Sequence, residues 1–341
     1  DNENPSPANQ SLDVVSAEKE TKLRLDINTN RNGWKLSYGA SVQLADYSNT
    51  TFSVIKKELR DDGGNIVQPA IRANFRSPLD PFARLGAFIQ IGKRLADNRL
   101  GVSAGIRTDM NTFTTEGMNG WQTLSPRISV SYVLADQWTW NSSVGIYYKI
   151  PPYTILGFAD NNNILVNKNA KYQRSIHYTS GFEFLPNDHL RFTIEGFYKQ
   201  YSNVPVSVRN GISLANLGTD FTLLGNEAVN TNGQGKTYGI EFFAQQKLTN
   251  RFFGILSYTF YRSLYSGADE KFNSSSWDNQ HLLSITWGYK FRNNWELGLK
   301  FRYQGGAPYS PFDETLSRLN YLSQGIGTLD YARLNAQRLG G

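Results

Sequence analysis

The stretch LRLDINTNRNGWKLSYGASVQL, residues 23–44, decides the fold of this chain. Apolar residues occupy every second position on both sides of the dipeptide Asn32-Gly33. These apolar positions are Leu23, Leu25, Ile27, Trp34, Leu36, Tyr38, Ala40, Val42 and Leu44. A period of two places them on one face of an extended strand, and Asn-Gly strongly favours a tight hairpin turn. The stretch therefore predicts a β-hairpin with one apolar face and one polar face.

The same unit recurs along the chain. Five further pairs of alternating runs are joined by short turns, at Ala96-Asp97-Asn98, Asp136-Gln137, Pro186-Asn187-Asp188, Thr249-Asn250 and Asn293-Asn294. The pattern predicts about six hairpins, or about twelve strands, of roughly 11 to 14 residues each. A strand in a globular sheet has about five or six residues, whereas one that crosses a bilayer needs about 9 to 11. The predicted strands are therefore long enough to span a membrane.

The connections between the hairpins differ from the turns within them. They are long and rich in Asn, Gly, Ser and Asp, and they cover residues 46–80, 111–120, 151–172, 202–235 and 266–278. Short turns at one end and long polar loops at the other are typical of an outer-membrane barrel. A soluble β-sandwich would mix loop lengths at both ends. The connections favour an all-β fold, a transmembrane antiparallel up-and-down β-barrel.

The second face of the strands is polar and charged. The strand that follows Pro186-Asn187-Asp188 shows the pattern, with polar positions at His189, Arg191, Thr193, Glu195 and Lys199. In a membrane barrel the apolar face meets lipid and the charged face lines a wet lumen. Trp138, Trp140 and Trp295 follow short turns, and Tyr147, Tyr148 and Tyr153 lie near the far end of the strand that begins at Trp138. This fits aromatic girdles at the two membrane interfaces.

Composition excludes several other classes of protein. The 341 residues include no cysteine, which excludes a disulfide scaffold and a Cys-ligated zinc or iron–sulfur site. Aromatic residues make up 13% of the chain, far more than a disordered chain carries. No apolar run approaches the ~18 residues of a membrane-spanning helix. The net charge is only +6 and the basic residues are not clustered, so we expect no nucleic-acid partner.

Several short motifs follow one another between residues 81 and 310. They are GAFIQ at 86–90 with GVSAGIRTD at 101–109, LSPRI at 124–128, YKIPP at 148–152, GKTYGIE at 235–241, WDNQH at 277–281 and YQGGAPY at 303–309. In this order and spacing they resemble the barrel of a TonB-dependent outer-membrane receptor of the kind abundant in Bacteroidetes. The resemblance implies that the protein lies in the bacterial outer membrane.

The resemblance implies a barrel of about 22 strands, of which the sequence pattern supplies about twelve. We interpret residues 1–341 as one partial barrel domain, with 1–18 a loop or disordered lead-in, 19–306 the strands and 307–341 a long external loop. The family's plug domain and periplasmic coupling box do not occur in this sequence. We therefore expect an internal piece of a longer protein.

The sequence offers no catalytic set. Only His177, His189 and His281 could act as imidazole bases, and each lies in a strand pattern. The Gly-rich stretch 233–239 lacks the strand–loop–helix setting of a phosphate-binding loop. We predict that the protein is not an enzyme and that it uses no cofactor and no metal.

The long loops hold the candidate ligand-binding residues, because loops on a rigid scaffold carry recognition. Aromatic side chains next to amides suit sugar or peptide-like ligands. The candidates are Tyr153, Phe158, Asn161 and Asn162 in the loop 151–172, Arg209 in the loop 202–235, and Phe272 and Trp277 in the loop 266–278.

The resemblance implies energised import of a scarce nutrient, which could be a siderophore, cobalamin, a glycan or a peptide. The implied partners are outer-membrane lipid, the nutrient ligand, a TonB-type inner-membrane energising complex that acts through the plug, and a surface lipoprotein as a further candidate. Two alternatives stay open. One is a passive porin or an outer-membrane assembly barrel, which a plug domain encoded upstream would argue against. The other is a soluble β-rich binding module, which extraction without detergent would favour.

Overall fold

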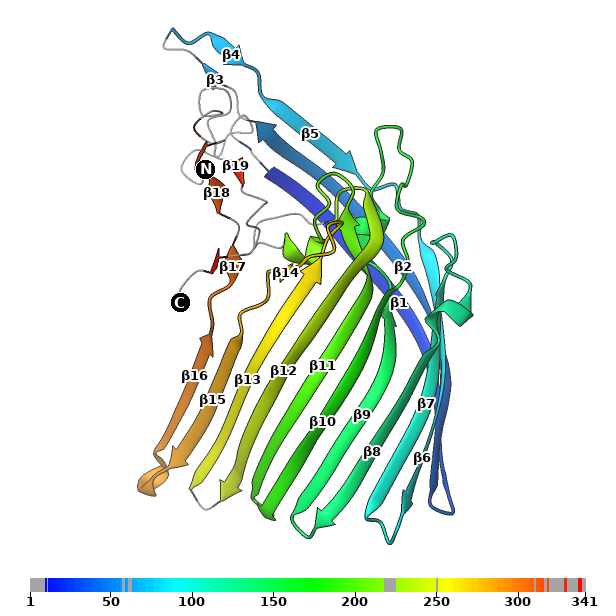
Figure 1. Cartoon of the computed structure of the whole chain (residues 1–341), viewed down its shortest axis with the longest axis vertical. Helices are drawn as coiled ribbons and strands as arrows, with labels where there is room; N and C mark the ends of the chain where they lie inside the picture. Colours follow the sequence, from blue (N-terminus) through cyan, green and yellow to red (C-terminus); the bar gives the residue numbers. More distant parts are fainter. Residues whose placement is uncertain are drawn as a thin grey trace.

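The structure is a computed structural model that describes residues 10, 12–56, 59–60, 63–217, 225–249, 251–309, 311–315, 318, 328–329 and 337–338. Within these residues, twelve long strands form one curved antiparallel wall in which each strand pairs with the next long strand along the chain (Figure 1). The all-β, up-and-down architecture is confirmed. The wall is an open sheet whose edges are β1 and β16.

Six hairpins make up this part of the wall, and all six predicted hairpins are confirmed. They are β1 (Leu12–Arg31) with β2 (Trp34–Lys56), β6 (Phe82–Leu95) with β7 (Leu100–Asn111), β8 (Ser125–Ala135) with β9 (Trp138–Lys149), β10 (Gln173–Asn187) with β11 (Leu190–Ser207), β12 (Val229–Thr249) with β13 (Phe252–Ser266), and β15 (His281–Lys290) with β16 (Glu296–Gln304). Figure 1 shows their short turns together at the lower end of the tilted strands and the long connections at the upper end.

Among the described residues, three of the six short turns contain left-handed backbone conformations. Asn32 and Gly33 have φ angles of 50° and 77° between β1 and β2. A two-residue hairpin turn needs positive φ at both central positions, and Asn and Gly adopt it at the least cost. Asn293 and Asn294 also have positive φ angles, 63° and 60°, in the longer turn between β15 and β16 that the Phe291 N–H closes by donating to the Trp295 carbonyl.

Several strands continue past the predicted limits at the long-loop end. Residues 12–18 were expected in a lead-in, but β1 already begins at Leu12 and pairs with β2 up to Ser53. Likewise β2 runs on to Lys56 and β5 (Ile71–Arg76) pairs with it inside the predicted loop 46–80. Cross-strand backbone hydrogen bonds hold these segments extended. In β5 the apolar residues Ile71, Ala73 and Phe75 also alternate with polar ones. Most of the predicted external loop 307–341 lies outside the described residues.

The remaining described elements are short. They are α1 (Tyr153–Leu156), η2 (Gly120–Thr123), η3 (Leu214–Asn216), η4 (Arg292–Asn294), β14 (Phe272–Ser274) beside β13, and the pairs β3 (Leu59–Arg60) with β4 (Ile66–Gln68), β17 (Pro308–Tyr309) with β20 (Gln337–Arg338), and β18 (Phe312–Asp313) with β19 (Thr328–Leu329). No helix in the described ranges is long and apolar enough to cross a bilayer.

The two faces of the wall follow the predicted alternation. The apolar face is exposed along the whole wall, with Leu23 77% and Ile240 54% exposed. The other face carries ion pairs within and between strands, including Arg24 with Asp26 at 2.6 Å.

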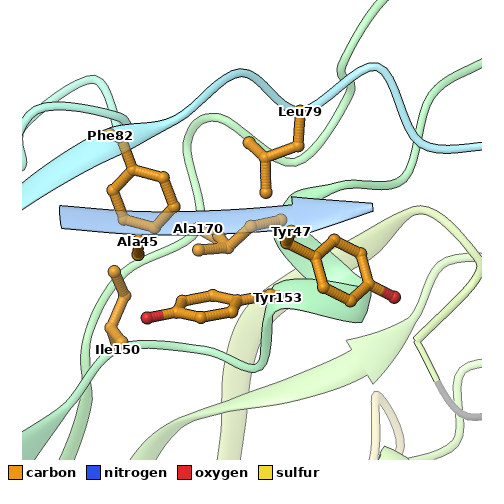
Figure 2. Close-up of a cluster of buried hydrophobic side chains, with 8 residues drawn as sticks. Ala45, Tyr47, Leu79, Phe82, Ile150, Tyr153 and Ala170 are labelled. Carbon is orange, nitrogen blue, oxygen red and sulfur yellow. The ribbon is translucent and has the colours of Figure 1, made fainter. Parts of the chain in front are cut away.

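The main buried apolar cluster lies at the long-loop end, on the lumen side of β2 (Figure 2). Its members are Ala45, Tyr47, Leu79, Phe82, Ile150, Tyr153, Leu156 and Ala170. We call this group the mouth cluster. Aromatic rings pack within it, since Phe82 and Tyr153 meet edge to face with centroids 5.5 Å apart. The loop 150–172 therefore folds inward against the wall rather than extending into solvent.

Candidate functional site

Tyr153 links the inward-folded loop to the wall. It is the first residue of α1 and is 7% exposed. Its hydroxyl donates to Glu20 Oε1 at 2.8 Å and accepts from Arg84 Nη1 at 3.0 Å. Arg84 also lies 3.5 Å from the same Glu20 oxygen. A phenol on the loop thus completes an ion pair between β1 and β6.

The electrostatics at Tyr153 favour the neutral phenol. Burial away from water raises the pKa of Tyr153 to about 12, and the hydrogen bond to Glu20 acts in the same direction while Arg84 opposes it. The hydroxyl therefore remains a hydrogen-bond donor across the physiological range. Burial also raises the pKa of the Tyr172 phenol, at the end of the same loop.

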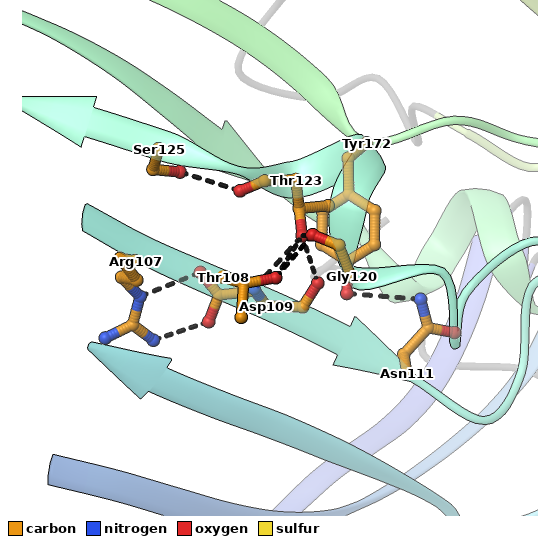
Figure 3. Close-up of polar contacts among 8 residues, drawn as sticks. All are labelled: Arg107, Thr108, Asp109, Asn111, Gly120, Thr123, Ser125 and Tyr172. Atoms are coloured by element: carbon orange, nitrogen blue, oxygen red, sulfur yellow. Dashed lines mark hydrogen bonds and ion pairs between the residues drawn. The ribbon is translucent and has the colours of Figure 1, made fainter. Parts of the chain in front are cut away.

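The loop 112–124 is fixed by a second polar network (Figure 3). Asn111 is fully buried, donates from Nδ2 to the Tyr172 hydroxyl at 3.2 Å, and accepts from the backbone N–H groups of Phe113 and Thr114. Thr123 ties the far end of the loop back to β7, because its hydroxyl donates to the Asp109 carbonyl oxygen at 2.5 Å. These bonds fix the position of the loop 112–124 at the long-loop end of the wall.

The predicted residues of the loop 151–172 are positioned as follows. Tyr153 is in the mouth cluster, and Phe158 stacks on Phe75 with ring centroids 5.6 Å apart. Asn161 and Asn162 are exposed in a turn, where the backbone N–H of Asn162 donates to the Asp160 side chain. The aromatic members thus pack against the protein, and the amides face solvent. Their contact with a ligand stays a prediction.

The other three predicted residues lie on neighbouring loops. Arg209 is exposed in a turn, and Trp277 is 57% exposed. The two loops contact each other, since the Ala268 N–H donates to the Gly211 carbonyl at 2.8 Å. Phe272 is 40% exposed, and Lys236 Nζ lies 4.5 Å from the centroid of its ring. The structure thus divides the seven candidates between the inward-folded loop and this loop pair.

A further group of rings lines the lumen just below these loops. We call it the inner aromatic row: Tyr147, His177, Tyr201 and Tyr265. The Tyr147 and His177 centroids are 4.5 Å apart, and Tyr201 and Tyr265 stack at 5.5 Å. Gly235 separates the last two in the register, and a Cβ there would clash with the Tyr265 ring. The glycine therefore lets the two rings meet across the strand between them.

A hollow of about 530 Å³ lies beside this row on the lumen face, and its lining includes Arg24, Arg107, Arg127 and Tyr147. Two of the guanidinium groups are paired, Arg24 with Asp26 and Arg107 with Asp109 at 2.5 Å. Arg127 lies 4.3 Å from the centroid of the Tyr147 ring, and no described carboxylate lies within ion-pair distance of it. The site can stack on planar groups, donate hydrogen bonds and attract negative charge.

Sequence reasoning missed the inner aromatic row and assigned Tyr147 to an interface girdle, whereas the structure places its ring on the lumen side. The alternation nevertheless contained part of the signal. Each ring lies on the polar side of its strand, where an aromatic side chain departs from the pattern. Such a departure marks the positions, but only the register shows that rings on different strands meet.

The comparisons with known proteins agree with this architecture. The family described as "TonB dependent receptor-like, beta-barrel" matches residues 2–339. No curated protein matches the sequence. Among solved structures, the pyoverdine outer-membrane receptor FpvA from Pseudomonas aeruginosa has a TM-score of 0.58 at 17% identity, over 89% of this chain and 44% of that one.

Two further solved structures are similar. The ferric-catecholate import receptor Fiu from Escherichia coli has a TM-score of 0.57 at 14% identity, over 87% of this chain and 45% of that one. The copper transporter OprC has a TM-score of 0.58 at 15% identity, over 85% and 43%. The chain spans less than half the length of these proteins. With the family match over nearly all its residues, the chain belongs to the β-barrel family of TonB-dependent receptors, which reside in the outer membrane.

Proposed function

We propose that this chain is the ligand-contacting wall of an energised importer of a scarce nutrient, a siderophore, cobalamin, a glycan or a peptide. The observation that carries the proposal is the inner aromatic row, with Arg127 beside it, directly under the inward-folded loop. Rings and a cation on a lumen wall suit a ligand that enters from outside and passes inward.

The energy for transport would come from outside this wall. A TonB-type inner-membrane complex would act on a plug domain inside the barrel, and a surface lipoprotein is a further candidate partner. The wall itself would hold the ligand until the plug moves. A passive porin, the main alternative, would need neither the plug nor the energising complex.

Ligand binding tests the role of the inner aromatic row. The full-length receptor is titrated by calorimetry with ferric catecholates, ferric hydroxamates, cobalamin, oligosaccharides and peptides. We expect one class to bind, and a Tyr201→Ala, Tyr265→Ala double variant to bind it about tenfold more weakly, because two stacking contacts are lost. The matched control is Tyr198→Ala, on the lipid-facing side of the same strand as Tyr201, which should bind normally. Unchanged binding by the double variant would refute the site.

Uptake of the same ligand tests the energy dependence. Collapse of the proton-motive force should stop uptake in cells that carry the wild-type receptor. Continued uptake would instead identify a passive pore.

A further inference from the structure

The lipid-facing side of β10–β15 carries a row of polar side chains at the long-loop end. We call it the outer polar row: Arg174, Gln200, Lys236, Arg262 and His281. Each shares its side of the strand with exposed apolar residues, because side chains two apart point the same way. Arg174 is on the side of Tyr178, and Lys236 is on the side of Ile240, which are 46% and 54% exposed. The row therefore faces lipid rather than the lumen.

These residues lie at one level across five neighbouring strands. In the register, Arg174 is opposite Ser202, Gln200 opposite Lys236, Tyr238 opposite Arg262, and Phe260 opposite His281. Barrel strands tilt by about 35–45° from the barrel axis. Residues at the same height in the membrane are therefore offset from their register partners by about one to two residues from each strand to the next. Three of the four steps along the row shift by two residues toward the short turns, and the step from Gln200 to Lys236 has no shift. The average shift fits this tilt, and its direction is that of the tilted strands in Figure 1.

The row borders an aromatic belt. Tyr178, Tyr198 and Tyr238 are opposite one another on adjacent strands, on the short-turn side of the row. They are 46%, 41% and 38% exposed. Tyrosine concentrates where the hydrocarbon of a membrane meets its headgroups. On the same three strands Arg174, Gln200 and Lys236 lie two to four residues further toward the long loops. The outer polar row therefore lies at the level of the outer-leaflet headgroups.

Two members of the row carry charge that the described residues do not neutralise. Arg262 is bound to the fully buried Asp278, with Nε 3.1 Å from Oδ2. In contrast, no carboxylate in the described ranges lies within ion-pair distance of Arg174 or Lys236. The ammonium of Lys236 is held over the Phe272 ring, which keeps it at the surface of the wall.

We infer that the outer polar row binds the phosphate groups of an anionic lipid headgroup in the outer leaflet. Arg174 would supply a guanidinium that matches phosphate geometry, Lys236 a compact positive charge, and Gln200 an amide donor between them. Charge complementarity and the level of the row above the tyrosine belt both favour a phosphorylated lipid over a neutral one. This lipid site is independent of the nutrient that the lumen side carries.

Lipid binding to the full-length receptor tests the inference. The receptor in neutral detergent is titrated with diphosphoryl lipid A or with phosphatidylcholine, and bound lipid is counted by native mass spectrometry. We expect selective retention of the diphosphoryl lipid. Arg174→Gln and Lys236→Gln should each weaken it about fivefold, and the double variant about 25-fold, since each headgroup cation contributes a similar share.

Lys93→Gln is the matched control. Lys93 is also lipid-facing and also lies over a ring, with Nζ 4.6 Å from the Trp34 centroid, but it is at the short-turn end. Its loss should leave binding unchanged, and heat-modifiable mobility on gels should show that all variants fold. Equal retention of phosphatidylcholine, or normal binding by the double variant, would overturn the inference. If inorganic phosphate displaced the lipid completely at equal concentration, the row would be a site for soluble anions and not for a lipid.

Discussion

Leu25 in the wall and Leu156 in the mouth are the same residue in two different surroundings. Leu25 is 63% exposed, whereas Leu156 is fully buried. The wall directs its apolar side chains outward, where lipid covers them, and it needs no protein core there. The mouth lies among polar loops and water, so it must build a core of its own from residues such as Tyr47, Phe82 and Tyr153. Apolar side chains therefore point outward to lipid in the wall but inward to a protein core in the mouth. The long-loop end of the wall is the boundary between the two arrangements.

The first prediction applies one substitution to both regions. Leu156→Ala should destabilise the mouth by about 2–5 kcal/mol, because it leaves a cavity in a packed cluster. Leu25→Ala should have a much smaller effect, since lipid fills the space. Protease cleavage within the loop 150–172 should accelerate only in Leu156→Ala, while both variants keep a heat-modifiable barrel. Equal cleavage in the two variants would mean that the mouth cluster does not hold the loop.

The second prediction tests the two faces of the wall with neighbouring residues. Phe242→Arg places a charge on the lipid-facing side, midway along β12 between the tyrosine belt and the short-turn end, and should cost about 2–4 kcal/mol near the bilayer centre. Glu241→Arg places the same side chain on the lumen side and should cost little. The measurement is the fraction of full-length receptor that inserts into vesicles in heat-modifiable form. A larger loss for Glu241→Arg would reverse the assignment of the faces.

Much of the wall was predictable from the sequence, because each hairpin combines a period of two with a short turn that needs Asn, Asp or Gly. The strand extensions at 12–18 and 71–76 were missed for different reasons. Residues 12–18 have no regular alternation, whereas 71–76 do alternate but form a single short run inside a long polar connection. The mouth cluster was missed for another reason. Its residues come from β2, the connection before β6, β6 itself and the loop 150–172, so only the folded wall brings them together. Tyr153 was singled out as a ligand contact, and the structure places it in this cluster.

The third prediction concerns the pH dependence of the mouth. Its effect is the smallest, about 0.5–1.5 kcal/mol for the loss of one hydrogen-bonding group in Tyr153→Phe. In the closed loop the pKa of Tyr153 is about 12, above its ordinary 10.0. An opened loop therefore releases the phenolic proton at lower pH than the closed loop does. The closed state is fully favoured below pH about 10 and loses this advantage as pH rises toward about 12.

Cleavage of the loop by an alkali-tolerant protease measures this dependence. The wild-type rate should rise steeply between those two pH values, relative to Tyr153→Phe at the same pH. Parallel pH profiles for the two proteins would show that Tyr153 does not control the loop.

The pairing of each long strand with the one before it has a kinetic consequence. Each hairpin closes over a turn of only a few residues, so little chain entropy is lost before its first contacts form. A hairpin forms in about 1–10 μs, and its outer strand then presents a free edge to the next hairpin. We expect this wall to grow by sequential addition along the chain, with no step that joins distant segments. The slow step would then be the inward folding of the loop 150–172. This loop can pack only after the parts of the wall that contribute to the mouth cluster have formed.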